Sequence, residues 1–236
     1  MSADTNVATD VAGPEEASPH RLLVFWRSTV GKKIVMGVTG VIGFLYVLFH
    51  VLGNLTIFIS ATTINNYAAL LKSNMEVLWA VRGVLLIAIL LHIAAATELA
   101  TKSLTSRPVG YSKWKAQSAN LASRTMRWTG PLLGLFIIYH LLHFTTGTLL
   151  EDFVEGDVFH NVVSGFQIWW VSAIYIVAML MLSLHLYPGV WSMCQSLGLN
   201  HPRYNKVIRG LATVITVLIV IGFISIPVAV LLGYGS

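Results

Sequence analysis

Four histidines lie inside long apolar segments of this chain, one in each segment: His50, His92, His140 and His185. An imidazole in an apolar medium needs a partner, and neutral imidazole is a common ligand of iron. At the rise of an α-helix, His50 and His140 fall at one depth. His92 and His185 fall together at a second depth. Two pairs at two depths predict the axial ligands of two haem irons. The chain has no Cys-x-x-Cys-His sequence for covalent attachment, so we expect two haem b groups.

The composition places these segments in a membrane. Of the 236 residues, 56% are hydrophobic and 11% are charged, which is about half the charged share of an average soluble domain. The mean hydropathy is +0.73. The net charge of +5 does not indicate nucleic-acid binding, because the basic residues gather in a few short loops. The single cysteine, Cys194, excludes an internal disulfide. We therefore expect an integral membrane protein with little mass outside the bilayer.

Five apolar segments each have about the ~20 residues that a helix needs to cross the hydrocarbon core. They run over about 34–58, 78–101, 128–149, 167–190 and 208–232. The predicted fold is an all-α membrane protein, a five-transmembrane-helix bundle that binds two haems and occupies residues 29–236. Residues 1–28 are expected to form a disordered cytoplasmic tail, because their first part is polar and acidic and lacks an apolar signal segment.

The distribution of lysine and arginine predicts the orientation of the bundle. Basic residues gather before the first segment, between the second and third, and between the fourth and fifth. The opposite loops carry Lys72 and Arg82, and the loop between the third and fourth segments is acidic. The positive-inside rule therefore predicts that the N-terminus is cytoplasmic and the C-terminus outside. The expected location is the bacterial cytoplasmic (inner) membrane, as a multi-pass protein.

A repeated motif supports the depth argument. A Thr-Gly dipeptide at 39–40 is followed, after nine residues, by His50, and a second at 129–130 is followed, after nine residues, by His140. On two helices that run the same way, this spacing puts both rings at one height. His143 lies one turn beyond His140 and is the alternative ligand. The repeated spacing favours His140, which leaves His143 as a contact for a haem propionate or a quinone.

Several of these residues also have a plainer interpretation. A single membrane histidine is often an interhelical hydrogen-bond partner, although four in two matched layers argue against that for the whole set. Gly43, two turns before His50 on the same face, leaves room for a flat porphyrin or for a closely packed helix. The remaining histidines, in the tail and loops, are expected to be solvated: His20, His160 and His201.

Five stretches carry a resemblance to a known family: GKKIVMGVTGVIGFLYVLFHVLGNL (31–55), INNYAALL (64–71), LLIAILLHIAAATELA (85–100), RWTGPLLGLFIIYHLLHFTTG (127–147) and LSLHLYPGVWSMCQSLG (182–198). In them the chain resembles the di-haem cytochrome b558 membrane anchor of succinate dehydrogenase and fumarate reductase. The resemblance implies a five-helix bundle. It also implies an outer haem held by His50 and His140, and an inner haem held by His92 and His185. Where some fumarate reductase relatives carry an intramembrane glutamate, this chain has Ser183.

The function that the resemblance implies is electron transfer between membrane quinone, menaquinone or ubiquinone, and a flavoprotein and an iron-sulfur subunit docked on the cytoplasmic face. The chain would act as a subunit of succinate:quinone oxidoreductase. It would have no dicarboxylate site of its own, since it has neither a flavin fingerprint nor a cysteine cluster. The quinone is expected near the outer haem, and Arg82 is a candidate partner of a haem propionate. The quinone candidates are Asn54, Asn65, Asn66, Tyr67 and His143.

Three alternatives stay open at this point. The first is the cytochrome b anchor of another quinone-linked dehydrogenase, of the hydrogenase or formate dehydrogenase type. The second is a transporter, which would need intramembrane acidic relays, whereas Glu98 is the only acid well within a predicted span. The third is a structural scaffold.

Overall fold

A computed structural model describes residues 19–106, 121–199 and 201–235. These residues form helices joined by turns, with a short 3₁₀ turn (η1, Thr56–Phe58) after α2 and a π-helical turn (η2, Leu141–Thr145) after α5. The α-helices are α1 (Pro19–Arg27), α2 (Thr29–Leu55), α3 (Ala61–Lys72), α4 (Met75–Thr105), α5 (Leu121–His140), α6 (Val158–Gln167), α7 (Trp169–Ser196) and α8 (Asn205–Leu231).

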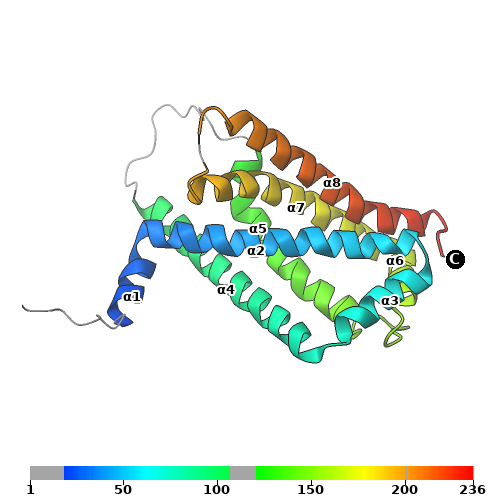
Figure 1. Cartoon of the computed structure of the whole chain (residues 1–236). Helices are drawn as coiled ribbons and strands as arrows, with labels where there is room; N and C mark the ends of the chain where they lie inside the picture. The colour runs from blue at the N-terminus through cyan, green and yellow to red at the C-terminus, as the bar shows by residue number, and fades with distance from the viewer. Residues whose placement is uncertain (1–18, 107–120, 200, 236) are drawn as a thin grey trace, which may run out of the picture.

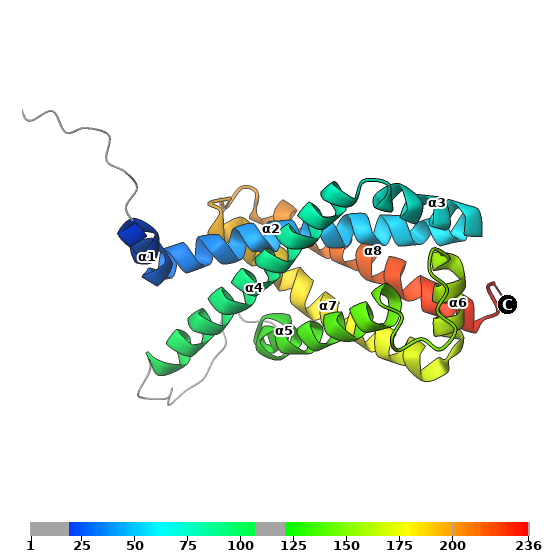
Figure 2. The ribbon, with the colours of Figure 1, turned by 90° about the horizontal axis from the view of Figure 1, so that it is seen from below.

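The long helices α2, α4, α5, α7 and α8 form one bundle (Figures 1 and 2). The starts of α2, α5 and α8 and the ends of α4 and α7 share one end, which we call the basic end after Lys32, Lys102 and Arg209. The other end carries α3, α6 and the C-terminus, and we call it the acidic end after the loop of residues 151–157. Helix α2 packs on α4, α7 and α8, and α5 packs on α7.

Within the described residues, four helices are long and apolar enough to cross a membrane: Thr29–Phe58, Met75–Thr105, Trp169–Ser196 and Asn205–Leu231. They confirm four of the five predicted spans and an integral membrane protein. The predicted third span corresponds to α5 and η2. Its apolar part is shorter, because Arg124 and Arg127 lie in its first two turns and Pro131 follows them.

The structure departs from the predicted boundaries at three places. Residues 19–27 form α1 within the stretch predicted as a tail, because an apolar run there precedes Ser28, whose hydroxyl accepts a hydrogen bond from Gly31 N at 2.8 Å and caps α2. Residues 1–18 lie outside the described part. The third helical segment ends at Thr145, since Gly147 has a φ of 70°. The short helices α3 and α6 were not predicted.

The acidic end is closed by a packed apolar cluster. Buried residues of η1, α3, α6, α7 and α8 meet there, among them Ile57, Ile64 and Phe166. Two long-range contacts fasten the cluster: Tyr234 Oη donates to Ile57 O at 2.6 Å, and Asn65 Nδ2 donates to Asp157 Oδ1 at 2.9 Å. This cap fixes α3 and α6 against the ends of the long helices.

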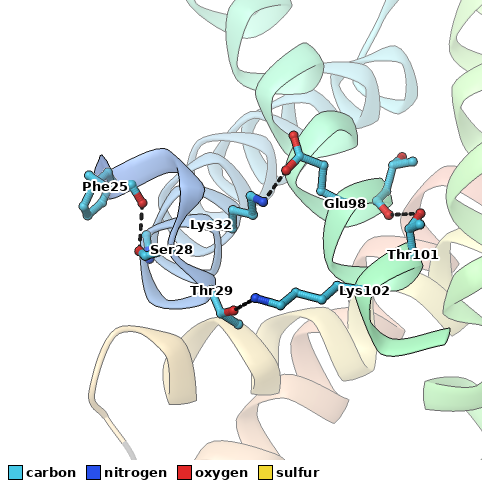
Figure 3. Close-up of polar contacts among 9 residues, drawn as sticks. Phe25, Ser28, Thr29, Lys32, Glu98, Thr101 and Lys102 are labelled. Atoms are coloured by element: carbon cyan, nitrogen blue, oxygen red, sulfur yellow. Dashed lines mark hydrogen bonds and ion pairs between the residues drawn. The ribbon is translucent and has the colours of Figure 1, made fainter. Parts of the chain in front are cut away.

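At the basic end, polar side chains join neighbouring helices (Figure 3). Lys32 of α2 forms an ion pair with Glu98 of α4, and Lys102 Nζ donates to Thr29 Oγ1 at 2.7 Å. Arg209 of α8 lies over the Trp191 ring of α7, 4.5 Å from its centroid. Glu98, the one acidic residue expected within a span, is thus paired with a lysine.

Candidate functional site

The four membrane histidines meet in two pairs. His50 of α2 faces His140 of α5, with ring centroids 5.8 Å apart and ring planes at 82°. His92 of α4 faces His185 of α7, with centroids 6.4 Å apart and planes at 61°. These are the two pairs that the depth argument predicted, with the first pair nearer the acidic end.

The ring separations suit a metal held between two imidazoles. Two imidazoles that bind one metal from opposite sides place their centroids about 6 Å apart, because each nitrogen lies about 2 Å from the metal and each centroid about 1 Å further out. In the described residues, no group of three or more His, Cys, Asp or Glu is placed to hold a metal ion. Two imidazoles on opposite sides leave the remaining positions of iron to a planar macrocycle, which is the ligand set of a bis-histidine haem.

The helix packing leaves room for such a macrocycle. The helices of each pair, α2 with α5 and α4 with α7, do not pack closely on each other, and their facing rings bridge them. Gly43 shares the face of α2 that carries Thr39 and His50. A Cβ added at Gly43 would meet no atom within 4 Å. The open space beside Gly43 and the ring separations of both pairs are the features that fit a haem.

A threonine contacts each histidine of the pair nearer the basic end. Thr39 Oγ1 of α2 lies 3.1 Å from Nδ1 of His92, and Thr129 Oγ1 of α5 lies 3.3 Å from Nδ1 of His185. Both threonines are buried. The sequence interpretation missed this role. Its signal was the Thr-Gly repeat, which was used only to set the depth of His50 and His140.

His140, rather than His143, faces His50. The ring of His143 packs on Phe144 at 4.1 Å, and its edge lies against Gly165 of α6, where an added Cβ would be 2.9 Å from Cε1. His143 lies in the π turn that follows His140, and such turns are frequent at functional sites. Tyr175 Oη of α7 lies 3.3 Å from Nδ1 of His140 and 3.1 Å from Nδ1 of His143.

Polar and aromatic groups also surround His50. Tyr46 stacks on its ring at 5.3 Å and 13°, and Asn54 Nδ2 donates to the His50 carbonyl at 2.8 Å and lies 3.4 Å from Nδ1. Tyr67 and Arg82 both lie within electrostatic range of the Tyr46 hydroxyl. The end of the bundle near His50 therefore gathers three of the groups expected there.

The other predicted quinone residues lie differently. Asn65 is committed to the neighbouring loop, because its amide nitrogen donates to Asp157 and its amide oxygen accepts from Phe159 N at 3.0 Å. The bond from His160 N and, next in size, the bond from the Asn65 amide lower the pKa of Asp157. Asn66 is exposed.

The remaining predicted residues have local roles. Arg82 lies over the ring of Trp79, 5.0 Å from its centroid. His160 was expected to be solvated, but its Nε2 lies 3.0 Å from Asp152 O and joins α6 to the loop before it. His201 accepts from Arg203 N at 3.2 Å in the exposed turn before α8. The side chain of His20 lies outside the described residues.

Comparison with known proteins gives the family. The family model described as succinate dehydrogenase/fumarate reductase transmembrane subunit matches residues 106–226, slightly more than half of the chain. The match covers α5 to α7 and most of α8, and with them His140, Tyr175 and His185. This chain belongs to that family and is a membrane-anchor subunit of a succinate dehydrogenase/fumarate reductase complex. No curated protein and no solved structure matches it.

Proposed function

We propose that this chain is the di-haem cytochrome b558 anchor of its complex, with α5 as the fifth membrane-spanning helix. His92 and His185 would hold the inner haem and His50 and His140 the outer one. The observation that carries the proposal is the pair of facing imidazoles at two levels, each at the separation that one bound iron requires. Bound haem would supply reversible one-electron transfer.

The distance between the two levels suits electron transfer across the bilayer. Thr39 contacts His92, and His50 follows Thr39 by 11 residues on the same helix. Eleven residues correspond to three turns, so the two pairs are about 16 Å apart along α2. The chain's own residues would hold the two haems at fixed separation and exclude water from them.

The basic end would face the cytoplasm and receive the iron-sulfur subunit, which in turn carries the flavoprotein. Basic residues of the starts of α2 and α8 and the end of α4 gather there, as the positive-inside rule requires of a cytoplasmic face. This orientation puts the C-terminus outside a bacterial cytoplasmic membrane.

Quinone would be handled at the acidic end, close to the outer pair. Tyr67 lies against Gly53 of α2, one turn beyond His50, and Asn54 contacts His50 itself. Asn66 is exposed on the same helix as Tyr67. Asn65 is assigned to the loop contact instead, since both ends of its amide are occupied.

A pyridine haemochrome assay on the purified complex tests the proposal. We expect about two haem b per copy of this chain, with a b-type reduced-minus-oxidised spectrum. Absence of haem would overturn the di-haem assignment. Succinate-dependent reduction of both haems in the complex would separate it from a hydrogenase or formate dehydrogenase anchor, which the family membership already disfavours.

A further inference from the structure

We propose that Thr39 and Thr129 are positioning residues for the inner haem: each hydroxyl accepts the Nδ1 hydrogen of an inner histidine and leaves Nε2 free for iron. The inference rests on the proposed di-haem function and goes beyond it. It names the groups that would fix the tautomer and the ring orientation of His92 and His185.

The direction of the Thr39 hydrogen bond follows from its neighbours. Thr39 Oγ1 lies 2.7 Å from Val35 O and 3.2 Å from Met36 O, as well as 3.1 Å from Nδ1 of His92. A carbonyl can only accept, so the single hydroxyl hydrogen is directed at a backbone carbonyl. The oxygen can then only accept from the ring. Nδ1 of His92 must therefore carry a hydrogen, which leaves the lone pair on Nε2.

Thr129 repeats this geometry on another helix. Its Oγ1 lies 3.3 Å from Met126 O and 3.3 Å from Nδ1 of His185. Its hydrogen is likewise directed at a carbonyl of its own helix, and Nδ1 of His185 is the donor to it. Thr129 is 2% exposed and Thr39 7% exposed. Water therefore does not compete with either hydroxyl for the ring.

The glycine after each threonine belongs to the same arrangement. A Cβ added at Gly40 would lie 3.8 Å from Cε1 of His92, and one added at Gly130 would lie 3.7 Å from Cε1 of His185. Each imidazole edge thus rests beside bare backbone while its Nδ1 reaches the hydroxyl. Each Thr-Gly dipeptide thus contacts one imidazole of the pair nearer the basic end, through the threonine hydroxyl and beside the glycine.

The outer pair lacks this arrangement. Nδ1 of His140 faces the phenol of Tyr175, and Nδ1 of His50 faces the amide of Asn54. Loss of a threonine hydroxyl should therefore act on the inner haem alone. A ligand histidine whose Nδ1–H is accepted is a stronger donor to iron and favours the oxidised state. Removing the acceptor should raise the reduction potential of the inner haem.

The test uses the intact purified complex with Thr39→Val, Thr129→Val and the double variant. Thr39→Ser and Thr129→Ser keep the hydroxyl and serve as rescues. Thr216→Val is the matched control, because Thr216 is a buried threonine of α8 whose hydroxyl has no hydrogen-bond partner in the described structure. The readouts are haem content, a redox titration of each haem followed optically, and the low-temperature EPR spectrum of the ferric haems.

We expect each valine variant to shift the midpoint of one haem upward and to move the EPR signal of that haem, which depends on the relative orientation of the two imidazole planes. The serine variants and Thr216→Val should match the wild type. Loss of the inner haem alone in the valine variants, with retention in the serine variants, also supports the proposal.

Three results would overturn the inference. The first is a double valine variant that binds both haems with unchanged midpoints and EPR signals. The second is an effect confined to the haem that His50→Ala removes. The third is an equal change of haem content, midpoint or EPR signal in the serine and the valine variants. A wild-type complex without haem would instead contradict the proposed function, so the two failures are distinguishable.

Discussion

Lys32 and Glu98 form an ion pair that joins α2 to α4 at the basic end. Their side chains are 12% and 43% exposed, so neither charge is fully enclosed by the protein. We predict that Glu98→Gln lowers the free energy of unfolding by at most about 1 kcal/mol, because an ion pair that the protein does not enclose contributes little. It should leave quinone turnover and haem content unchanged. Thermal unfolding in detergent measures the first effect.

Glu76→Gln is the control for this prediction, since Glu76 is an exposed acid in the first turn of α4. A proton-relay role for Glu98 would give the opposite pattern, with turnover lost at unchanged stability.

The histidine pairing predicts which variants resemble each other. His50→Ala and His140→Ala should each reduce haem content from two to one and remove the same spectral component. His92→Ala and His185→Ala should remove the other component. His143→Ala should retain both haems, since the ring of His143 packs on Phe144 and against α6. An outer site that is emptied by His143→Ala and still filled in His140→Ala would show that His143 is the ligand.

Gly43 tests where the macrocycle lies. A Cβ added at Gly43 meets no atom of a neighbouring helix or side chain within 4 Å, and the position shares a face with His50. Gly43→Leu should therefore fold and insert normally but bind less haem. Gly210→Leu on α8 is the matched control, because that glycine is also free of neighbours within 4 Å. Equal haem content in the two variants would mean that the space beside Gly43 is not used by a cofactor.

Asn65 and Asn66 differ in role although they are adjacent and identical. Asn65→Ala removes the bonds to Asp157 and Phe159 N, and each should contribute about 0.5–1.5 kcal/mol to stability. Asn66→Ala, at an exposed position, should change the unfolding free energy by less than about 0.5 kcal/mol. Thermal unfolding of the two variants measures this difference in stability. If Asn65→Ala lost quinone turnover but kept wild-type stability, Asn65 would be a quinone contact after all.

The lowered pKa of Asp157 predicts that the stability of the acidic end decreases slightly at low pH. The N–H of His160 and the amide of Asn65 hold its pKa below the usual 3.8. A carboxyl with a depressed folded-state pKa contributes stability above its unfolded-state pKa and loses that contribution as the pH falls through the folded-state value. Thermal stability should therefore fall slightly more steeply below about pH 4 in the wild type than in Asp157→Asn. Identical acid profiles would contradict this assignment.

Depth along a helix follows from residue numbers, so the levels of the four histidines could be predicted from the sequence. The four most apolar spans could also be predicted, because length and hydropathy decide them. Length and hydropathy do not show which helices pack on each other. The contact of Thr39 with His92 joins residues 53 positions apart, and it depends on α2 packing beside α4.

At the acidic end, too, a long-range contact could not be predicted from the sequence. Asn65 looked available because it lies in a polar loop segment between two spans. Its partner, Asp157, is 92 residues away and belongs to a loop whose shape depends on α6. Short helices such as α3 and α6 are formed by caps and by packing on the cluster around Ile57, which span-length patterns do not report.

The histidine pairing also sets an order of biogenesis. Each pair takes one ring from α2 or α4 and the other from α5 or α7. N-terminal segments are synthesised first. His140 therefore completes the pair with His50, and His185, which follows 45 residues later, completes the pair with His92. A nascent chain can therefore contain both histidines of the first pair while the second pair still lacks His185.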